Sequence, residues 1–152
     1  MSNARGVRFQ RANFVVSDLD RSLILYRDIL GMQVDFIKDS DAASYSYPVF
    51  EIAREARLRF AVLSTPTQPR VMALTEVKSD ARLAAQPSLP RRAAIVLEIK
   101  DIDGVLQDCS QQGLHAYPEE VLETHDGRTG REVGVVDPDG NLVVIYYIPV
   151  AA

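Results

Sequence analysis

Large apolar residues recur at two different spacings in the first half of the chain. Within residues 57–64 every second side chain is large and apolar, which is the period of a strand. Residues 23–30 place apolar side chains three and four apart, the period of a helix, and Gly31 follows as a suitable C-terminal cap. Residues 45–55 fit either a short helix with Pro48 in its first turn or an extended edge segment. The same patterns predict further strands over residues 8–16, 32–38 and 71–77.

The second half of the chain repeats this order. A strand over residues 95–99 precedes Asp101, as the first strand precedes Asp18, and each Asp is suited to cap a helix. Gly113 ends the second helix as Gly31 ends the first. Three more strands are predicted over residues 115–122, 133–136 and 142–148. This internal repeat predicts an α+β fold built from two βαβββ modules.

The two modules are predicted to form a single domain over residues 1–152. The first module covers residues 7–77 and the second covers residues 93–149. Residues 78–92 between them contain two prolines and few large apolar residues, a composition typical of a linker. A long surface loop inside one domain fits the same composition.

Two stretches are specific enough to compare with a known family. The first reads Val-Val-Ser-Asp-Leu-Asp-Arg-Ser at 15–22 and Tyr-Arg-Asp-Ile-Leu-Gly-Met at 26–32, and the second reads Arg-Glu-Val-Gly-Val-Val-Asp-Pro-Asp-Gly-Asn at 131–141. Both resemble the glyoxalase, bleomycin-resistance and extradiol-dioxygenase group, the vicinal oxygen chelate (VOC) superfamily. The resemblance covers residues 8–149. It implies that the modules form a curved, mostly antiparallel sheet around a cup.

In the metalloenzymes of this superfamily, four strand positions in the cup supply metal ligands. The resemblance assigns these positions to Arg11, Ala73, Ala94 and Val144, and a shifted alignment would bring Glu76 closer to one of them. Arginine carries a fixed positive charge, and alanine and valine offer no lone pair, so none of the four suits a divalent metal. The expectation is therefore a protein without a metal cofactor and with an apolar cup.

The alternation of side chains along a strand extends this assignment to the wall of the cup. If Arg11 faces inward, Asn13 does too, and the same reasoning applies to the other strands. Glu98 is then the expected internal partner of Arg11 if that arginine is structural. Arg57 or Arg59 is expected to add a second cation at the rim. The predicted ligand-binding residues are Arg11, Asn13, Arg59, Thr75, Glu98, Val144 and Tyr146.

Few other residues suggest chemistry. His115 and His125 are the only histidines, and His125 lies beside Asp126 in a turn-rich loop, a pairing that would orient an imidazole for acid–base catalysis. Both also fit surface or packing positions. With Glu76, the two histidines leave an off-pattern site as an open alternative.

Charge and composition narrow the classes of function. The formal net charge is −4 and no basic patch is interleaved with aromatic residues, which argues against nucleic-acid binding. No apolar run approaches the roughly 18 residues that cross a membrane. The N-terminus lacks the apolar segment of a signal peptide, and the single Cys109 fits a reducing compartment, so a cytoplasmic location is expected. The resemblance also implies a two-fold homodimer.

These observations favour a metal-free VOC protein that binds a small organic molecule in an apolar cup, with sequestration of the kind seen in bleomycin-resistance proteins as one version. One alternative is an enzyme, a lyase, isomerase or dioxygenase of glyoxalase type with an off-pattern metal or none. A second alternative is an accessory interaction module whose own side chains fill the cup.

Overall fold

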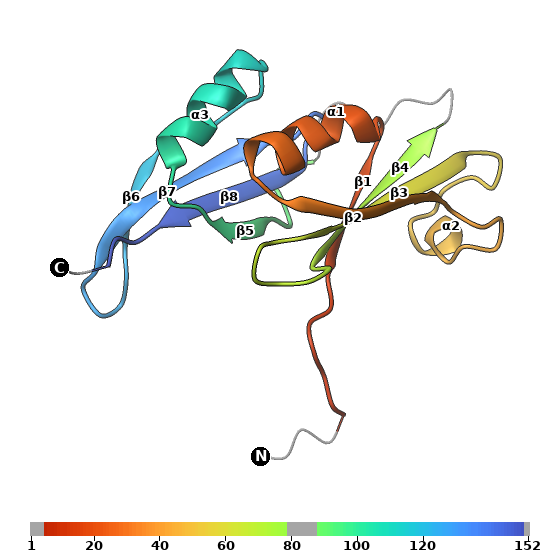
Figure 1. Ribbon diagram of the computed structural model, residues 1–152, viewed down its shortest axis with the longest axis horizontal. Helices are drawn as coiled ribbons and strands as arrows, with labels where there is room; N and C mark the ends of the chain where they lie inside the picture. The colour runs from red at the N-terminus through yellow and green to blue at the C-terminus, as the bar shows by residue number, and fades with distance from the viewer. Residues whose placement is uncertain (1–4, 79–87, 151–152) are drawn as a thin grey trace.

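The computed structural model describes residues 5–78 and 88–150, which form two four-stranded sheets with the two longer helical segments on one side (Figure 1). The strand order is β1-β4-β3-β2 in the first sheet and β5-β8-β7-β6 in the second. The pairs β1–β4 and β5–β8 are parallel, and the other pairs are antiparallel. The elements are β1 (Ala12–Val16), α1 (Leu19–Leu23), the π-helix η1 (Ile24–Ile29), β2 (Gln33–Asp39), α2 (Ser46–Val49), β3 (Arg57–Ser64), β4 (Met72–Lys78), β5 (Ile95–Glu98), α3 (Ile102–Gln111), β6 (Glu120–Glu123), β7 (Thr129–Val136) and β8 (Leu142–Tyr147).

The repeated strand order confirms the predicted α+β fold of two βαβββ modules. Equivalent residues begin the two long helical segments, because the side chains of Asp18 and Asp101 both accept a hydrogen bond from the backbone N–H three residues later. Gly31 and Gly113 both adopt positive φ angles, +83° and +70°, after the segments end. Of the predicted linker 78–92, residues 79–87 lie outside the described residues.

Two local details differ from what the sequence pattern predicts, and a third settles a choice that the pattern left open. The first helical segment turns into the π-helix η1, and Leu25, which lies outside the predicted apolar face, is fully buried there. The predicted strand over 115–122 is reduced to β6 and one bridge from Ala116 to Val135. Pro118 lies between these two pairings and lacks the N–H that a ladder requires. Within residues 45–55, α2 is the short helix that the pattern left open.

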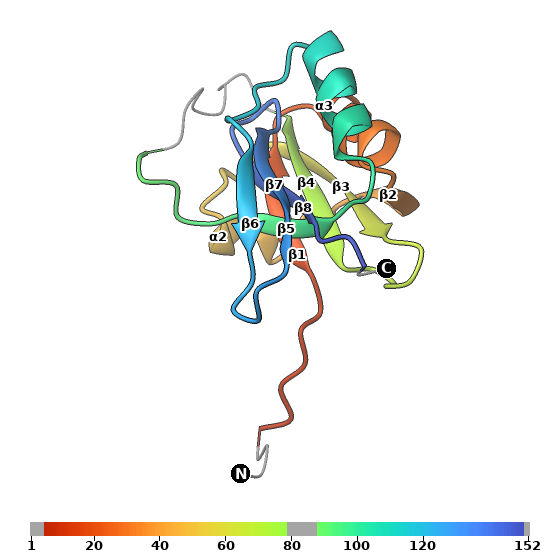
Figure 2. The same cartoon turned by 90° about the vertical axis from the view of Figure 1, so that its left-hand side faces the viewer.

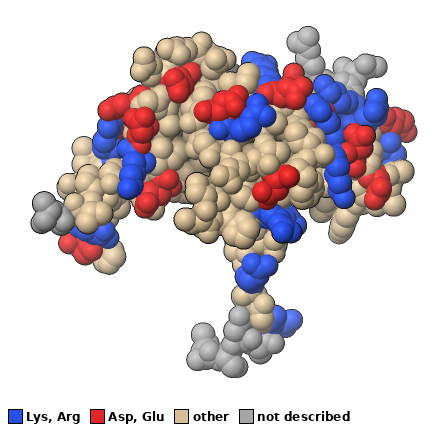
Figure 3. All heavy atoms as spheres, viewed as in Figure 1, with Lys and Arg blue, Asp and Glu red and all other residues tan. Residues whose placement is uncertain are grey.

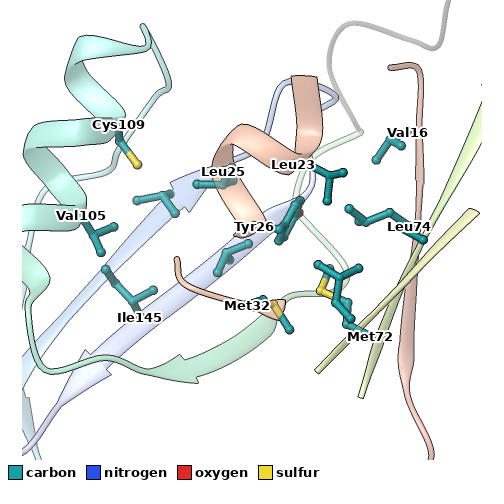
Figure 4. Close-up of a cluster of buried hydrophobic side chains, with 14 of the residues drawn as sticks. Val16, Leu23, Leu25, Tyr26, Met32, Met72, Leu74, Val105, Cys109 and Ile145 are labelled. Carbon is teal, nitrogen blue, oxygen red and sulfur yellow. The ribbon is translucent and has the colours of Figure 1, made fainter. Parts of the chain in front are cut away.

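One apolar core joins the two modules. The helical segments α1–η1 and α3 lie on the same side of the two sheets, as both ribbon views show (Figures 1 and 2). Leu23, Leu25 and Tyr26 lie between side chains of the second module and side chains of the first (Figure 4). The neighbours in this cluster include Val105, Cys109 and Ile145 from the second module and Val16, Met72 and Leu74 from the first. None of the described helices has the length and apolarity needed to cross a membrane.

The turn between β7 and β8 ties the second module to the first. The carboxylate of Asp137 is buried and accepts a 2.8 Å hydrogen bond from the Tyr26 hydroxyl of η1. The Asp139 carboxylate accepts hydrogen bonds from the backbone N–H and the hydroxyl of Ser17, at 3.0 and 2.6 Å. The Asn141 amide donates to the carbonyl of Val15 at 3.3 Å. Side chains of one turn therefore hold both the end of β1, through Val15 and Ser17, and the π-helix η1, through Tyr26.

Burial determines how the central pair of this contact titrates. Removal from water raises the pKa of Asp137, although hydrogen bonds from Asn141 and Tyr26 act in the opposite direction. Burial and the neighbouring Asp137 charge raise the pKa of Tyr26 well above its ordinary value. Tyr26 therefore stays protonated and donates its hydrogen bond throughout the neutral range.

Replacing Tyr26 by Phe tests this contact between the modules. Tyr26→Phe keeps the buried ring but removes a hydrogen bond to a carboxylate, so we expect the free energy of unfolding to fall by about 1.5–3 kcal/mol. Because the folded pKa of Tyr26 is raised, the hydroxyl's contribution is fully present below about pH 10 and is lost as the pH rises through the folded pKa. The stability difference between wild type and variant should therefore shrink above pH 10 in chemical denaturation. Tyr45→Phe is the control, because Tyr45 is 69% exposed. Equal losses for the two variants would contradict the assignment.

Candidate functional site

The strand register of the first sheet builds a pocket on the face opposite to α1 and η1. Asn13, Ala73, Val62 and Phe36 pair in sequence across β1, β4, β3 and β2 and form one row. Two residues further along, Thr75, Phe60 and Lys38 form a parallel row. Both rows line a pocket of about 400 Å³ whose floor, made by Val62, Ala73 and Thr75, is buried. Arg11, Arg70 and the serines at positions 40, 44 and 46 complete its walls.

A bulge in β2 places one of these aromatic residues. The pairing register with β3 shifts between Val34 and Phe36, so Asp35 is an extra residue in the strand. In a regular strand Val34 and Phe36 would face the same side. Here Val34 packs against the core, while Phe36 lines the pocket and meets Phe60 edge to face, with ring centroids 5.9 Å apart. The bulge thus supplies an aromatic wall to the pocket.

The pocket collects positive charge without an acidic side chain among its lining residues. Arg11, Lys38 and Arg70 all line it, and no ion pair joins any of the three to an acidic residue in the described part of the chain. Lys38 lies over the Phe60 ring, 5.5 Å from its centroid. On the molecular face in Figure 3, acidic and basic side chains are instead interspersed. The arrangement suits a ligand that carries negative charge.

Thr75 on the buried floor and the exposed Asn13 beside it together add a hydrogen-bond donor. The Thr75 hydroxyl donates to the side-chain oxygen of Asn13 at 2.9 Å. This bond orients the Asn13 amide, and no described residue accepts a hydrogen bond from its nitrogen. The amide N–H groups are therefore available to an oxygen of a ligand beside Arg11.

The structure divides the seven predicted binding residues. Arg11, Asn13 and Thr75 line the pocket of the first sheet. Glu98 and Tyr146 line a separate groove of about 850 Å³ beside the β3–β4 turn, where Tyr146 donates a 3.5 Å hydrogen bond to Glu98. Arg59 and Val144 line neither of these hollows.

The pocket of the first sheet is formed by one module, because no described residue of the second module lines it. Arg11 and Glu98 consequently line different hollows, and no ion pair joins them. The first pocket is also less apolar than expected, since Lys38, Arg70 and three serines enter it from β2, the β3–β4 turn and the segment around α2. Of the four positions from the resemblance, only Arg11 and Ala73 line this pocket.

Two features of the sequence could have identified the missed residues. Leu58, Phe60 and Val62 alternate clearly, and this apolar face of β3 turns toward the pocket side of the sheet. Lys38 follows Phe36 at a spacing of two, which places both on one face. Arg70 gives no such signal, because it lies in a turn between strands.

The residues of the pocket do not fit a divalent metal. Arg11 and Ala73 line the pocket, Ala94 lines a different hollow with Phe9, and Val144 lies on β8, so the four expected ligand positions do not converge. Their side chains also lack donor atoms for a cation. Within the described residues, no three His, Cys, Asp or Glu side chains group in a way that could hold a metal ion.

Glu76 is held on the opposite side of the sheet from the pocket. It lies opposite Arg59 in the pairing of β3 with β4. Glu76 directly follows Thr75, so the two side chains face opposite sides of the sheet. Its carboxylate is fully buried and accepts a 2.7 Å hydrogen bond from Arg59 Nε and a 2.5 Å hydrogen bond from the Leu19 N–H at the start of α1. Glu76 and Arg59 therefore anchor the first helix to the sheet.

The histidines lie outside the pocket. His115 stacks edge to face on Tyr117, with ring centroids 4.8 Å apart, and both side chains are exposed. His125 is exposed in the β6–β7 turn, where Asp126 is paired with Arg128. Neither imidazole lines the pocket that contains Arg11.

Comparison with known proteins agrees with this architecture. The family model described as Glyoxalase/Bleomycin resistance protein/Dioxygenase superfamily matches residues 8–145, and the chain therefore belongs to this family. No curated protein sequence matches it. The family sequence motifs and the paired βαβββ modules thus lead to the same assignment.

Solved structures of the same fold are similar over nearly the whole chain. A glyoxalase family protein from Bacillus cereus is 15% identical with a TM-score of 0.74, covering 97% of this chain and 98% of that one. The trypanothione-dependent glyoxalase I of Leishmania major is 22% identical with a TM-score of 0.58, covering 93% and 87%. The fosfomycin resistance protein FosX of Listeria monocytogenes, solved with Mn(II) and sulfate, is 11% identical with a TM-score of 0.53, covering 90% and 88%. At these identities the likeness shows the fold.

Replacing Glu76 tests its structural role. Glu76→Gln removes the charge of a buried carboxylate whose partner Arg59 is partly exposed, and it weakens the anchor at the start of α1, so we expect the free energy of unfolding to fall by about 1.5–3 kcal/mol. Glu98→Gln is the matched control, because Glu98 is exposed and its one hydrogen bond is long, and we expect a change of less than about 0.5 kcal/mol. Urea denaturation of both variants measures the difference. A Glu76 variant as stable as the wild type would show that the anchor is unimportant.

Proposed function

We propose that this protein reversibly binds a small organic anion in the pocket of its first module, without a metal. The observation that carries the proposal is the presence of three cations, Arg11, Lys38 and Arg70, in one pocket that has no acidic lining residue. Uncompensated positive charge beside an apolar surface favours an anionic ligand with an apolar body. Capture of a drug or metabolite, as in bleomycin-resistance proteins, is the version of VOC function that these residues support.

Arg11 is the proposed clamp for the anionic group. It precedes β1 and lies two residues before Asn13, whose amide N–H groups can bind the same oxygen atoms, and both line the pocket. A guanidinium binds a carboxylate through charge-assisted hydrogen bonds and retains its charge at every physiological pH. Phe36 and Phe60 line the same pocket on β2 and β3 and offer a surface to the apolar part of the ligand.

Binding of benzoate and of its neutral isostere benzamide tests the clamp. We expect Arg11→Met to weaken benzoate binding by about tenfold to a hundredfold, the effect of losing one charge-assisted hydrogen bond, with little change for benzamide. Isothermal titration in the presence of a chelator measures both affinities and tests metal independence at the same time. Arg21→Met is the control, because Arg21 is exposed on α1 and does not line the pocket. Loss of benzoate binding on chelation, or equal effects of the two substitutions, would refute the proposal.

We also propose that the protein forms a homodimer through the apolar surface near β1 and β5. Phe9 and Val96 are 73% and 61% exposed and line one hollow together with Ala94. Clustered exposed apolar side chains support a protein–protein contact, and a two-fold dimer would use this patch on both copies.

Light scattering tests the dimer. We expect a mass of about twice the 16.9 kDa of one chain at micromolar concentration. Phe9→Ser should shift the equilibrium toward the monomer while circular dichroism stays unchanged, because the side chain is exposed. A wild-type mass equal to that of one chain would rule the dimer out.

A further inference from the structure

Arg70 differs from the other two pocket cations in its backbone. Its φ angle is +52°, in the left-handed region that side chains with a Cβ rarely adopt. Glu51 is the one other described residue, apart from glycines, with positive φ. A glycine would occupy this turn position without strain, so the long cationic side chain is present at a conformational cost.

A chain of hydrogen bonds fixes this unfavourable conformation. The Arg70 N–H donates to the Ser64 hydroxyl oxygen at 2.8 Å, and the same hydroxyl donates to the Asp35 carboxylate at 2.6 Å. Ser64 is buried at the end of β3, and Asp35 is the bulge residue of β2. The bulge that turns Phe36 into the pocket therefore also holds the backbone that carries Arg70.

The pocket has more positive charge than a ligand with one carboxylate can balance. Arg11 and Arg70 each directly precede one partner of a backbone hydrogen bond, because the N–H of Ala12 donates to the carbonyl of Val71 at 2.9 Å. Their backbones are therefore neighbours at the edge of the sheet. Lys38 adds a third positive charge from β2. Like charges held in one hollow repel each other, and a ligand with two negative charges relieves this repulsion more than a ligand with one.

From these observations we infer that the preferred ligand of the pocket is an organic dianion with a flat apolar body, and that Arg70, positioned by Ser64, selects it over a monoanion. This inference rests on the proposed function and names the substrate class for that site. Arg11 and Asn13 bind one anionic oxygen, Arg70 and Lys38 bind the second charge, and the apolar body lies against Phe36 and Phe60. The dianionic group is a phosphate monoester or a pair of carboxylates.

Four probes of similar size measure the selectivity. Phthalate and phenyl phosphate carry close to two negative charges at pH 7.5, benzoate carries one, and benzamide is neutral. We expect at least one of the two dianions to bind at least about tenfold tighter than benzoate in isothermal titration at constant ionic strength, which corresponds to one further charge-assisted hydrogen bond. Comparing phthalate with phenyl phosphate identifies which dianionic group the pocket takes.

Variants of Arg70 separate selection from folding. Arg70→Gly removes the side chain and relieves the backbone, so we expect an unchanged or higher melting temperature and a dianion-to-benzoate affinity ratio close to one. Glu51→Gly is the matched control, because it relieves the same kind of strain at φ +55° outside the pocket and should leave all four affinities unchanged. Ser64→Ala should lower the ratio while Ser64→Thr, which keeps the hydroxyl, should restore it.

The outcomes distinguish this inference from the function on which it rests. Benzoate binding as tightly as both dianions, or a ratio that Arg70→Gly leaves unchanged, would overturn the selection by Arg70. If Arg11→Met still weakened benzoate binding in that case, the proposed anion binding would stand. Failure of all four probes to bind at millimolar concentration would overturn both.

Discussion

The buried carboxylate of Asp137 is the contact on which the relative placement of the two modules depends. It receives the Tyr26 hydroxyl from the first module and three donors from its own turn, two backbone N–H groups and the Asn141 amide. Because all of these donors point inward to one side chain, the turn is rigid where it meets the end of β1. The apolar cluster around Leu25 and Tyr26 then packs against a surface already held in place.

The two sides of the first sheet differ in whether a carboxylate accompanies the basic side chains. Glu76 faces the helices, where Arg59 and the start of α1 satisfy its carboxylate. The residues next to Glu76 and Arg59 along their strands face the opposite side of the sheet. On that side the described pocket is lined by cations and hydroxyls but by no carboxylate. Because successive side chains of a strand face opposite sides of the sheet, a protein with a net negative charge can still have a positively charged pocket.

The same geometry supports the proposed anion binding. Arg11 and Ala73, two of the positions that the resemblance assigned to metal ligands, both line the hollow of the first sheet, and neither offers a donor atom to a cation. A guanidinium in such a position attracts the oxygen atoms of an anion directly. Aromatic and hydroxyl side chains from neighbouring strands then shape the space around it.

The sequence by itself determined the modules and their helix caps. Asp18, Asp101, Gly31 and Gly113 act locally, so their roles could be predicted from spacing, and alternation predicted that Arg11 and Asn13 face the same side, where both line the pocket. Whether those residues bind a ligand is a question for the titrations.

Only the tertiary structure decided which distant residues share a hollow. Lys38 and Phe36 enter the pocket through a bulge at Asp35, and Arg70 enters through a left-handed turn held by Ser64, features that depend on strand pairing rather than on neighbouring residues. The separation of Arg11 from Glu98 likewise follows from how the two sheets are placed, which side-chain periodicity within one strand does not specify.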